Sequence, residues 1–160
     1  MKDDAMSIRE LAEARFQQGY SCSQAVFSSL AEPWGIYPAV SLRVAAGFGG
    51  GMARSGATCG CVTAGMMAIG LAQSSVTPDE NRAEKEKTSE LCRQFMINFA
   101  EKNGSTMCLD LLGVDIRTPQ GLAQARDLGI IKSKCPNFVR DAVEMVESLV
   151  LLNGAHGKLR

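Results

Sequence analysis

Apolar residues recur through most of the chain at the three- and four-residue spacing of one helix face. Ile8, Leu11 and Phe16 form the first such stripe, directly after the start of the capping-box sequence "SIRE". A second capping box, "SCSQ", begins at Ser21 and predicts the next helix. No stretch alternates between apolar and polar residues for long enough to predict a strand. The pattern therefore predicts an all-α fold, a bundle of about seven or eight helices.

Helix start signals divide the rest of the chain. The further helices are predicted over 38–47, 59–73 and 78–102, then after Ser105, after Thr118 and from Cys135 onward. Proline is typical of the first turn of a helix, because the N–H that it lacks is unpaired there anyway. In the helix over 78–102, Leu91, Phe95 and Phe99 are expected to dock against the core.

Length and charge narrow the class of protein. The 160 residues correspond to a single helical domain over 1–160, in which 153–160 are expected to form a loose tail. The 17 basic and 17 acidic residues cancel, so no net field attracts nucleic acid or an anionic membrane. The first residues carry no apolar secretion signal, and the low-charge run over 55–76 indicates a buried helix more than a membrane span. We therefore expect a cytoplasmic protein without membrane insertion.

Four of the six cysteines fall at predicted helix starts. Cys22 follows the second capping serine, Cys59 opens the small-residue helix, and Cys108 comes three residues after Ser105. Cys135 directly precedes a proline. A helix start presents unpaired N–H groups and partial positive charge, which lower the pKa of a cysteine and favour the thiolate that binds metals and acts as a nucleophile. These four are the candidate redox-active and metal-binding residues.

The other two cysteines are weaker candidates. Cys61 lies two residues after Cys59, about 200° around a helix axis, so the two side chains are expected to point in different directions. Whether Cys61 is an additional metal ligand is left open by the sequence. Cys92 neighbours Leu91 on a docking face and is expected to serve core packing. Any single cysteine of the six could also be an ordinary small buried residue.

The segment "GFGGGMARSG" joins two predicted helices and contains Gly49, Gly50, Gly51 and Arg54. Glycine lets the backbone approach a neighbouring group closely, so these residues are candidate cofactor contacts, with Arg54 helping to hold a thiolate. A flexible connection between helices explains the glycines equally well. A nucleotide site is excluded because no strand precedes the glycines and no Gly-Lys-Ser/Thr motif is present.

Together these segments resemble the C_GCAxxG_C_C family, a group of redox-active proteins named after its own motif. The matching stretches are "SCSQAVFSSLAE", "GFGGGMARSGATCG", "STMCLDLLG" and "CPNFVRDAVE", in family order over about residues 8–150. By position, the four shared cysteines fall on Cys22, Cys59, Cys108 and Cys135. This alignment sets Cys61 in the place of the motif's alanine and displaces its glycine to Gly65. The resemblance implies redox or metal chemistry at the four cysteines.

Three functions fit these residues. In the first, the cysteines ligate an iron–sulfur cluster, or otherwise zinc, for electron transfer with an unidentified redox partner protein. In the second, the protein is a metal-free thiol–disulfide oxidoreductase, although Cys-X-X-Cys is absent and the only histidine, His156, lies in the predicted tail. In the third, a binding or structural helical module merely buries its cysteines. The sequence leaves open whether the protein is an enzyme.

Overall fold

The computed structural model describes residues 6–74 and 77–152, so the predicted tail over 153–160 lies outside the described residues. The elements in chain order are α1 (Ile8–Gln17), α2 (Cys22–Ala31), η1 (Glu32–Trp34), α3 (Pro38–Ala45), η2 (Ala46–Phe48), α4 (Gly60–Gln73), α5 (Pro78–Asn103), α6 (Cys108–Leu112), α7 (Pro119–Asp127) and α8 (Ile130–Leu152). Within these ranges, the extended pairing is limited to one isolated antiparallel bridge, between Thr58 and Met107. The predicted all-α fold class is confirmed.

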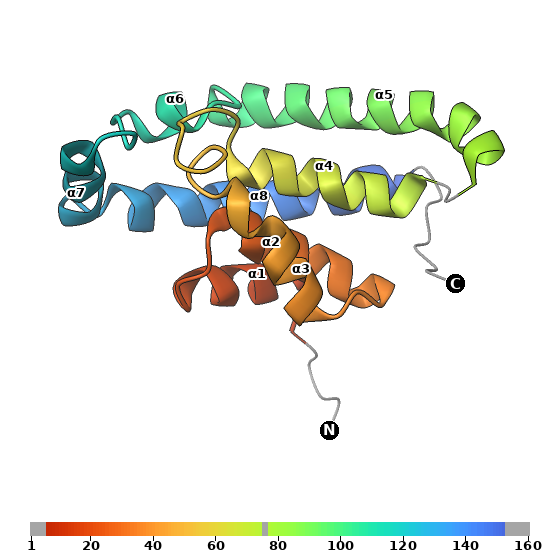
Figure 1. Ribbon diagram of the computed structural model, residues 1–160, viewed down its shortest axis with the longest axis horizontal. Helices are drawn as coiled ribbons and strands as arrows, with labels where there is room; N and C mark the ends of the chain where they lie inside the picture. The colour runs from red at the N-terminus through yellow and green to blue at the C-terminus, as the bar shows by residue number, and fades with distance from the viewer. Residues whose placement is uncertain (1–5, 75–76, 153–160) are drawn as a thin grey trace.

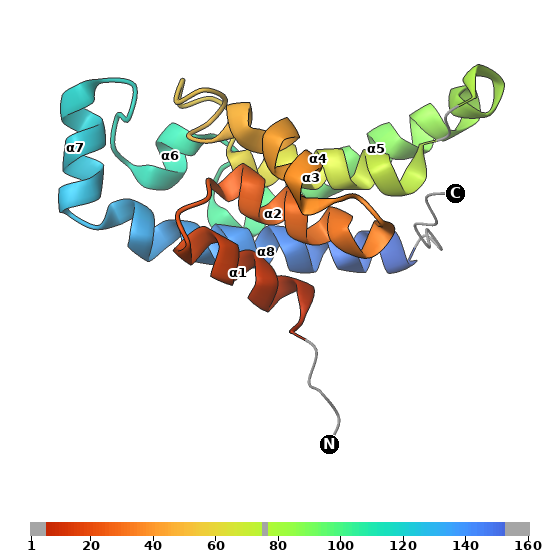
Figure 2. The ribbon, with the colours of Figure 1, turned by 60° about the horizontal axis from the view of Figure 1, so that its bottom comes forward.

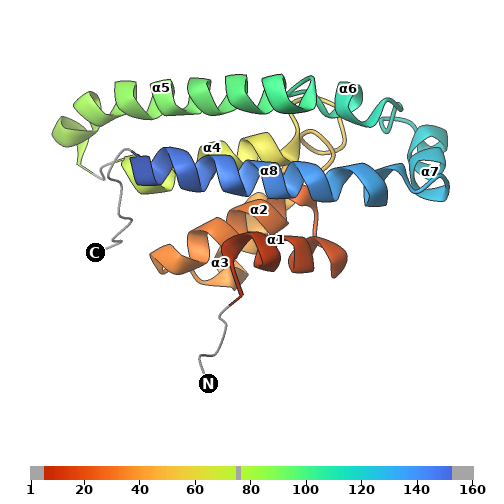
Figure 3. The same cartoon turned by 180° about the vertical axis from the view of Figure 1, so that it is seen from behind.

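The helices form three layers (Figure 1). α5 lies along one side, α4 and α8 run through the middle, and α1, α2 and α3 cover the other side. Seen from behind, α8 passes between α5 and the α1–α3 layer (Figure 3). α6 and α7 lie at one end of the molecule, beside the start of α8 (Figure 2). Among the described helices, none is long and apolar enough to cross a lipid bilayer.

Two hydrophobic clusters stabilise this arrangement. The main core lies where α2, α4, α5 and α8 meet, and it contains the fully buried Phe95 and Phe99 of α5 together with Val139 and Val146 of α8. The docking face that periodicity predicted for α5 is therefore confirmed. A smaller second cluster is formed by α6, α7 and the start of α8, and its buried members are Cys108, Leu112, Ile116 and Ala125.

Local signals fixed several helix starts correctly. The capping boxes at Ser7 and Ser21 are both formed, and the Thr118 hydroxyl accepts a hydrogen bond from the backbone N–H of Gly121. α6 is an exception, because it begins at Cys108 and not directly after Ser105. The Ser105 hydroxyl instead accepts from the Met107 N–H and donates to a carboxylate in the first turn, which organises the loop before the helix.

α8 begins earlier than the sequence predicted. We expected it to start at Cys135, but it begins at Ile130 and carries Pro136 in its interior. An interior proline costs about 3 kcal/mol, because it removes a hydrogen bond and crowds the preceding turn. Ile130 and Ile131 pack against the second cluster, and this apolar burial helps to offset that cost. Cys135 therefore lies inside a helix, and its predicted position at a helix N-terminus is wrong.

Two glycines of α4 give a matched test of the packing. A Cβ atom at Gly65 would lie 2.4 Å from the Phe95 ring, whereas one at Gly70 would meet nothing within 4 Å. We expect Gly65→Ala to lower the free energy of unfolding by about 1–3 kcal/mol through overpacking. Gly70→Ala should raise it by about 0.5–1 kcal/mol, because alanine favours a helix over glycine. Urea unfolding of both variants measures the difference, and equal effects at the two positions would contradict the packing.

Candidate functional site

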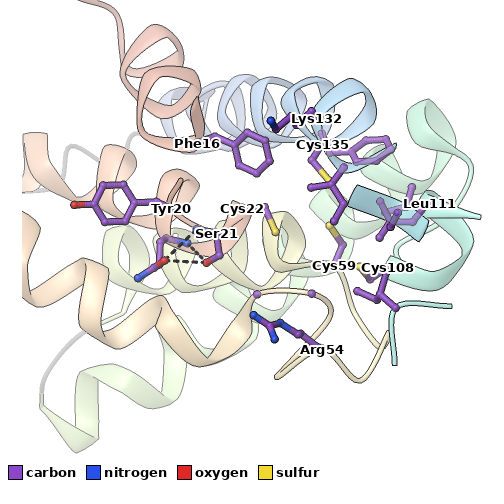
Figure 4. A pocket seen from close by; sticks show the side chains of 18 of the residues that line it. Phe16, Tyr20, Ser21, Cys22, Arg54, Cys59, Cys108, Leu111, Lys132 and Cys135 are labelled. Atoms are coloured by element: carbon purple, nitrogen blue, oxygen red, sulfur yellow. Dashed lines mark hydrogen bonds between the residues drawn. The ribbon is translucent and has the colours of Figure 1, made fainter. Parts of the chain in front are cut away.

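Five of the six cysteines lie where the two hydrophobic clusters meet. Cys22, Cys59 and Cys61 belong to the main core, whereas Cys108 and Cys135 belong to the second cluster. One cavity of about 1220 Å³ is lined by Cys22, Cys59, Cys108 and Cys135. Their sulfur atoms gather on one side of that cavity (Figure 4). The fold thus brings the four cysteines singled out from the sequence to a single cavity.

The start of α2 fixes the position of Cys22, the first residue of this helix. The Ser21 hydroxyl accepts a hydrogen bond from the Gln24 N–H, and the Gln24 side chain accepts one from the Ser21 N–H. The Gln24 amide also donates to the Leu42 carbonyl, which ties this helix start to α3. Cys22 is buried as a result, with 8% of its surface exposed.

Glycine residues let the chain pass very close to these cysteines. A Cβ atom at Gly60 would lie 2.7 Å from the Cys22 Sγ, and one at Gly51 would lie 2.6 Å from the Cys108 Cβ. Such contacts are too short for any side chain, so glycine is required at both positions. Gly49 is equally restricted, since its Cβ would lie 2.8 Å from the Ser21 Cβ. The groups that these glycines approach closely are therefore side chains of the protein itself.

A short antiparallel bridge aligns the starts of α4 and α6. The Cys59 N–H donates to the Thr106 carbonyl at 2.8 Å, and the Cys108 N–H donates to the Ala57 carbonyl at 2.7 Å. Residues on either side of such a bridge are held at a fixed separation. The bridge therefore brings together two cysteines that are far apart in the sequence.

Cys61 also belongs to the buried thiol group. The sulfur atoms of Cys22, Cys59 and Cys61 all lie within 4.8 Å of one another, a group that could hold a metal ion. The expectation that Cys59 and Cys61 point in different directions is therefore wrong. Cys59 is the N-cap residue of α4, with an extended ψ of 138°, so the helical rotation between the two residues does not apply. Sequence patterns do not fix a helix boundary to one residue, which is why Cys61 was undervalued.

Hydrogen bonds among the three thiols separate their pKa values. The Cys59 and Cys61 thiols donate to the Cys22 sulfur and hold the Cys22 pKa well below its usual range, with help from the backbone N–H groups of Gly50 and Ser23. The hydrogen bond that the Cys59 thiol donates to Cys22 raises the pKa of Cys59. Burial raises the pKa of Cys61. Cys22 is therefore the thiol that ionises first.

The remaining thiols stay protonated for a simpler reason. Burial raises the pKa of Cys108 to about 12 and also raises that of Cys135, and the negative charge of Cys22 adds to both shifts. Burial alone raises the pKa of Cys92 on α5. Among the four predicted candidates, only Cys22 has the lowered pKa that a helix start was expected to give. At Cys59 and Cys108, donation to Cys22 or burial outweighs the helix charge, and Cys135 does not lie at a helix start.

A left-handed backbone turn over residues 50–54 forms part of the cavity wall, with φ values from 55° to 71°. Its three non-glycine residues, Met52, Ala53 and Arg54, each cost about 1–2 kcal/mol in this conformation. The turn brings the Gly50 N–H to the Cys22 sulfur and sets Arg54 beside the cavity (Figure 4). The groups that lower the Cys22 pKa are thiols and backbone N–H donors, and Arg54 is not among them.

The thiol hydrogen bonds predict a titration of the reduced, metal-free protein. Because its pKa is lowered, Cys22 should remain a thiolate below the usual thiol range and lose its charge only as the pH falls through the lowered value. Cys59→Ala removes a donor and should shift this titration to higher pH. Ultraviolet thiolate absorbance follows the change, and Cys92→Ala serves as the control. An identical titration for Cys59→Ala and the unmodified chain would contradict the hydrogen-bond assignment.

One known family matches most of the chain. The family described as "Putative redox-active protein (C_GCAxxG_C_C)" matches residues 20–149. Its motif element Gly-Cys-Ala-X-X-Gly corresponds to the sequence from Gly60 to Gly65, with Val62 in the alanine position. Aligned in this way, the motif cysteine is Cys61, whereas the alignment predicted from the sequence sets Cys59 in that position. No curated protein and no solved structure matches the chain significantly. Since the family match spans most of its length, this protein belongs to the C_GCAxxG_C_C family.

Proposed function

We propose that the protein transfers electrons through an iron–sulfur cluster held by these thiols. The observation that carries the proposal is the buried group of Cys22, Cys59 and Cys61, whose sulfur atoms lie within 4.8 Å of one another. Around a tetrahedral metal with metal–sulfur bonds of about 2.3 Å, neighbouring sulfur atoms lie about 3.8 Å apart. The three sulfur atoms are therefore close enough to share one metal atom. In an iron–sulfur cluster, where sulfide fills part of the coordination of each iron, they would bind to more than one iron.

The chemistry of the donors favours iron over zinc. Sites made only of thiolates suit both metals. Zinc has no redox chemistry, however, and its role here would be structural. The protein belongs to a family described as redox-active, which supports iron. When bound, an iron–sulfur cluster supplies one-electron transfer.

The surrounding residues have separate tasks in this proposal. Cys22 has the lowest pKa of the three thiols, so it offers the first anionic ligand, while Cys59 and Cys61 would release their protons on binding. Cys108 or Cys135 supplies the remaining ligand from the second cluster. The Gly50 and Ser23 N–H groups donate to the Cys22 sulfur, and hydrogen bonds of this kind tune the potential of a cluster.

The exposure of the thiols suggests where electrons enter and leave. Cys135 is half-buried, whereas the thiols of Cys22, Cys59, Cys61 and Cys108 are buried. A redox partner protein is therefore expected to approach on the Cys135 side. All six cysteines are free thiols. Free thiols suit a reducing compartment, and we assign the protein to the cytoplasm on this ground.

A metal-free thiol–disulfide oxidoreductase is the second candidate. It is favoured by the lowered pKa of Cys22, because a thiolate beside two thiols is the nucleophile that disulfide exchange needs. Closing a disulfide between the Cys22 thiolate and a neighbouring thiol would release one proton and pass two electrons to an oxidant. Such a protein would contain no iron, and its count of free thiols would fall reversibly on mild oxidation.

Metal analysis of serine variants tests the proposal. The unmodified chain, purified without air, should contain iron and acid-labile sulfide. Cys22→Ser, Cys59→Ser and Cys61→Ser should each lower the bound iron by about tenfold or more, since outer-shell changes alone cost about 10–100-fold in metal affinity. The double variant Cys108→Ser/Cys135→Ser should lose iron as fully as Cys22→Ser, because it removes both sources of the remaining ligand.

Cys92→Ser is the matched control for these variants. Cys92 is also buried, but it lies on α5 and no other cysteine contributes to its pKa shift. Iron content should be unchanged in this variant, and circular dichroism should show that all variants keep their helices. Full iron retention in Cys22→Ser, or loss from Cys92→Ser equal to that from Cys22→Ser, would overturn the ligand assignment.

A further inference from the structure

We propose that the cavity beside the thiols is a binding site for a small organic anion with an aromatic or aliphatic body. Arg54, Arg126 and Lys132 would select the negative charge, and the apolar wall would hold the body of the molecule. This site goes beyond electron transfer at the thiols, and it does not require that a metal be bound. It would bring a small molecule directly beside the redox-active group.

Apart from the cysteines, the charged side chains that line the cavity are all basic. Arg54 comes from the left-handed turn, Arg126 from α7 and Lys132 from α8, whereas none of the described lining residues is acidic. Arg54 and Lys132 lie on different sides of the cavity (Figure 4). A cleft that is lined by one sign of charge and has apolar walls concentrates the field and attracts counter-ions. The cavity should therefore attract anions.

Within the described residues, these three basic side chains lack the ion pairs that most of the arginines elsewhere form. Ion pairs with carboxylates are formed by Arg9, Arg15, Arg93, Arg117 and Arg140. Over residues 6–74 and 77–152, no carboxylate pairs with Arg54, Arg126 or Lys132. Their charges are available to a ligand, and a carboxylate, sulfonate or phosphate would supply the missing counter-charge.

The rest of the lining suits an apolar molecule. Phe16 and Phe138 stand on the side of the main core, and Leu111, Ile116 and Ile131 contribute aliphatic surface. Ligand sites are typically concave, mostly apolar, and equipped with a few polar groups that fix orientation. With a volume of about 1220 Å³, this cavity has room for a drug-sized molecule. A concave site of this kind favours a small molecule over the surface of an acidic protein.

Ionisation of Cys22 would not cancel this attraction. As a thiolate it would be one negative charge against three positive side chains, and its sulfur accepts hydrogen bonds from two thiols and two N–H groups. Cys22 is buried, whereas the three cations are exposed. An incoming anion would therefore meet the cations first, while its body lies against the apolar wall near the sulfur atoms.

A matched pair of probes tests the proposal on the full chain as purified. Naphthoate and its uncharged amide, naphthamide, share the same aromatic body, so the difference between their dissociation constants reports the contribution of charge. Isothermal titration calorimetry at low salt should give naphthoate about tenfold tighter binding than naphthamide, with the advantage shrinking as salt is added. The readout is independent of iron, so its failure is distinguishable from failure of the proposed electron-transfer function.

Charge-neutralising variants locate the site. Arg54→Gln, Arg126→Gln and Lys132→Gln should each weaken naphthoate binding by about threefold or more and leave naphthamide unchanged. Arg43→Gln is the matched control, because Arg43 on α3 is exposed and does not line the cavity. Equal affinity for the two probes, no binding of naphthoate, or an equal effect of Arg43→Gln would overturn the proposal. Binding of acidic peptides but not of naphthoate would also overturn it, in favour of a protein ligand.

Discussion

The close contact between the Cys22 sulfur and Gly60 is the constraint on which the thiol site depends. The starts of α2 and α4 meet at this point, and a Cβ atom at position 60 would lie 2.7 Å from the sulfur. The requirement for glycine directly before the motif cysteine is therefore steric. Glycine is also required at Gly65, the second motif glycine, because the Phe95 ring fills the space beside it. Together the two glycines set the position of α4, and with it the position of Cys61.

The site also depends on a division of the hydrophobic interior. One cluster is built around α2, α4, α5 and α8, and the other around α6, α7 and the first turns of α8. The two are joined by α8 itself and by the bridge between Thr58 and Met107. Thiols face the boundary from both clusters, so a metal held there would link them. In this arrangement, binding of the metal and stability of the fold would be coupled.

The sequence predicted what local chemistry decides. The capping boxes at Ser7 and Ser21 require only neighbouring residues, so they were found, as was the apolar face of α5. The start of α8 was missed because packing of two isoleucines on the second cluster overrides the local signal of Pro136. The role of Cys61 was undervalued because it depends on one non-helical residue. The three unpaired cations come from distant segments, and no local pattern indicates that they share a cavity.

A redox titration of the protein purified without air, followed by its visible absorbance, tests the electron-transfer centre most directly. Iron bound by thiolates gives charge-transfer absorption, which should bleach on reduction and return on oxidation. The amplitude should scale with the iron bound per chain, and Cys22→Ser should abolish it. A colourless protein without iron, whose spectrum stays constant through the titration, would contradict an iron–sulfur centre at these thiols.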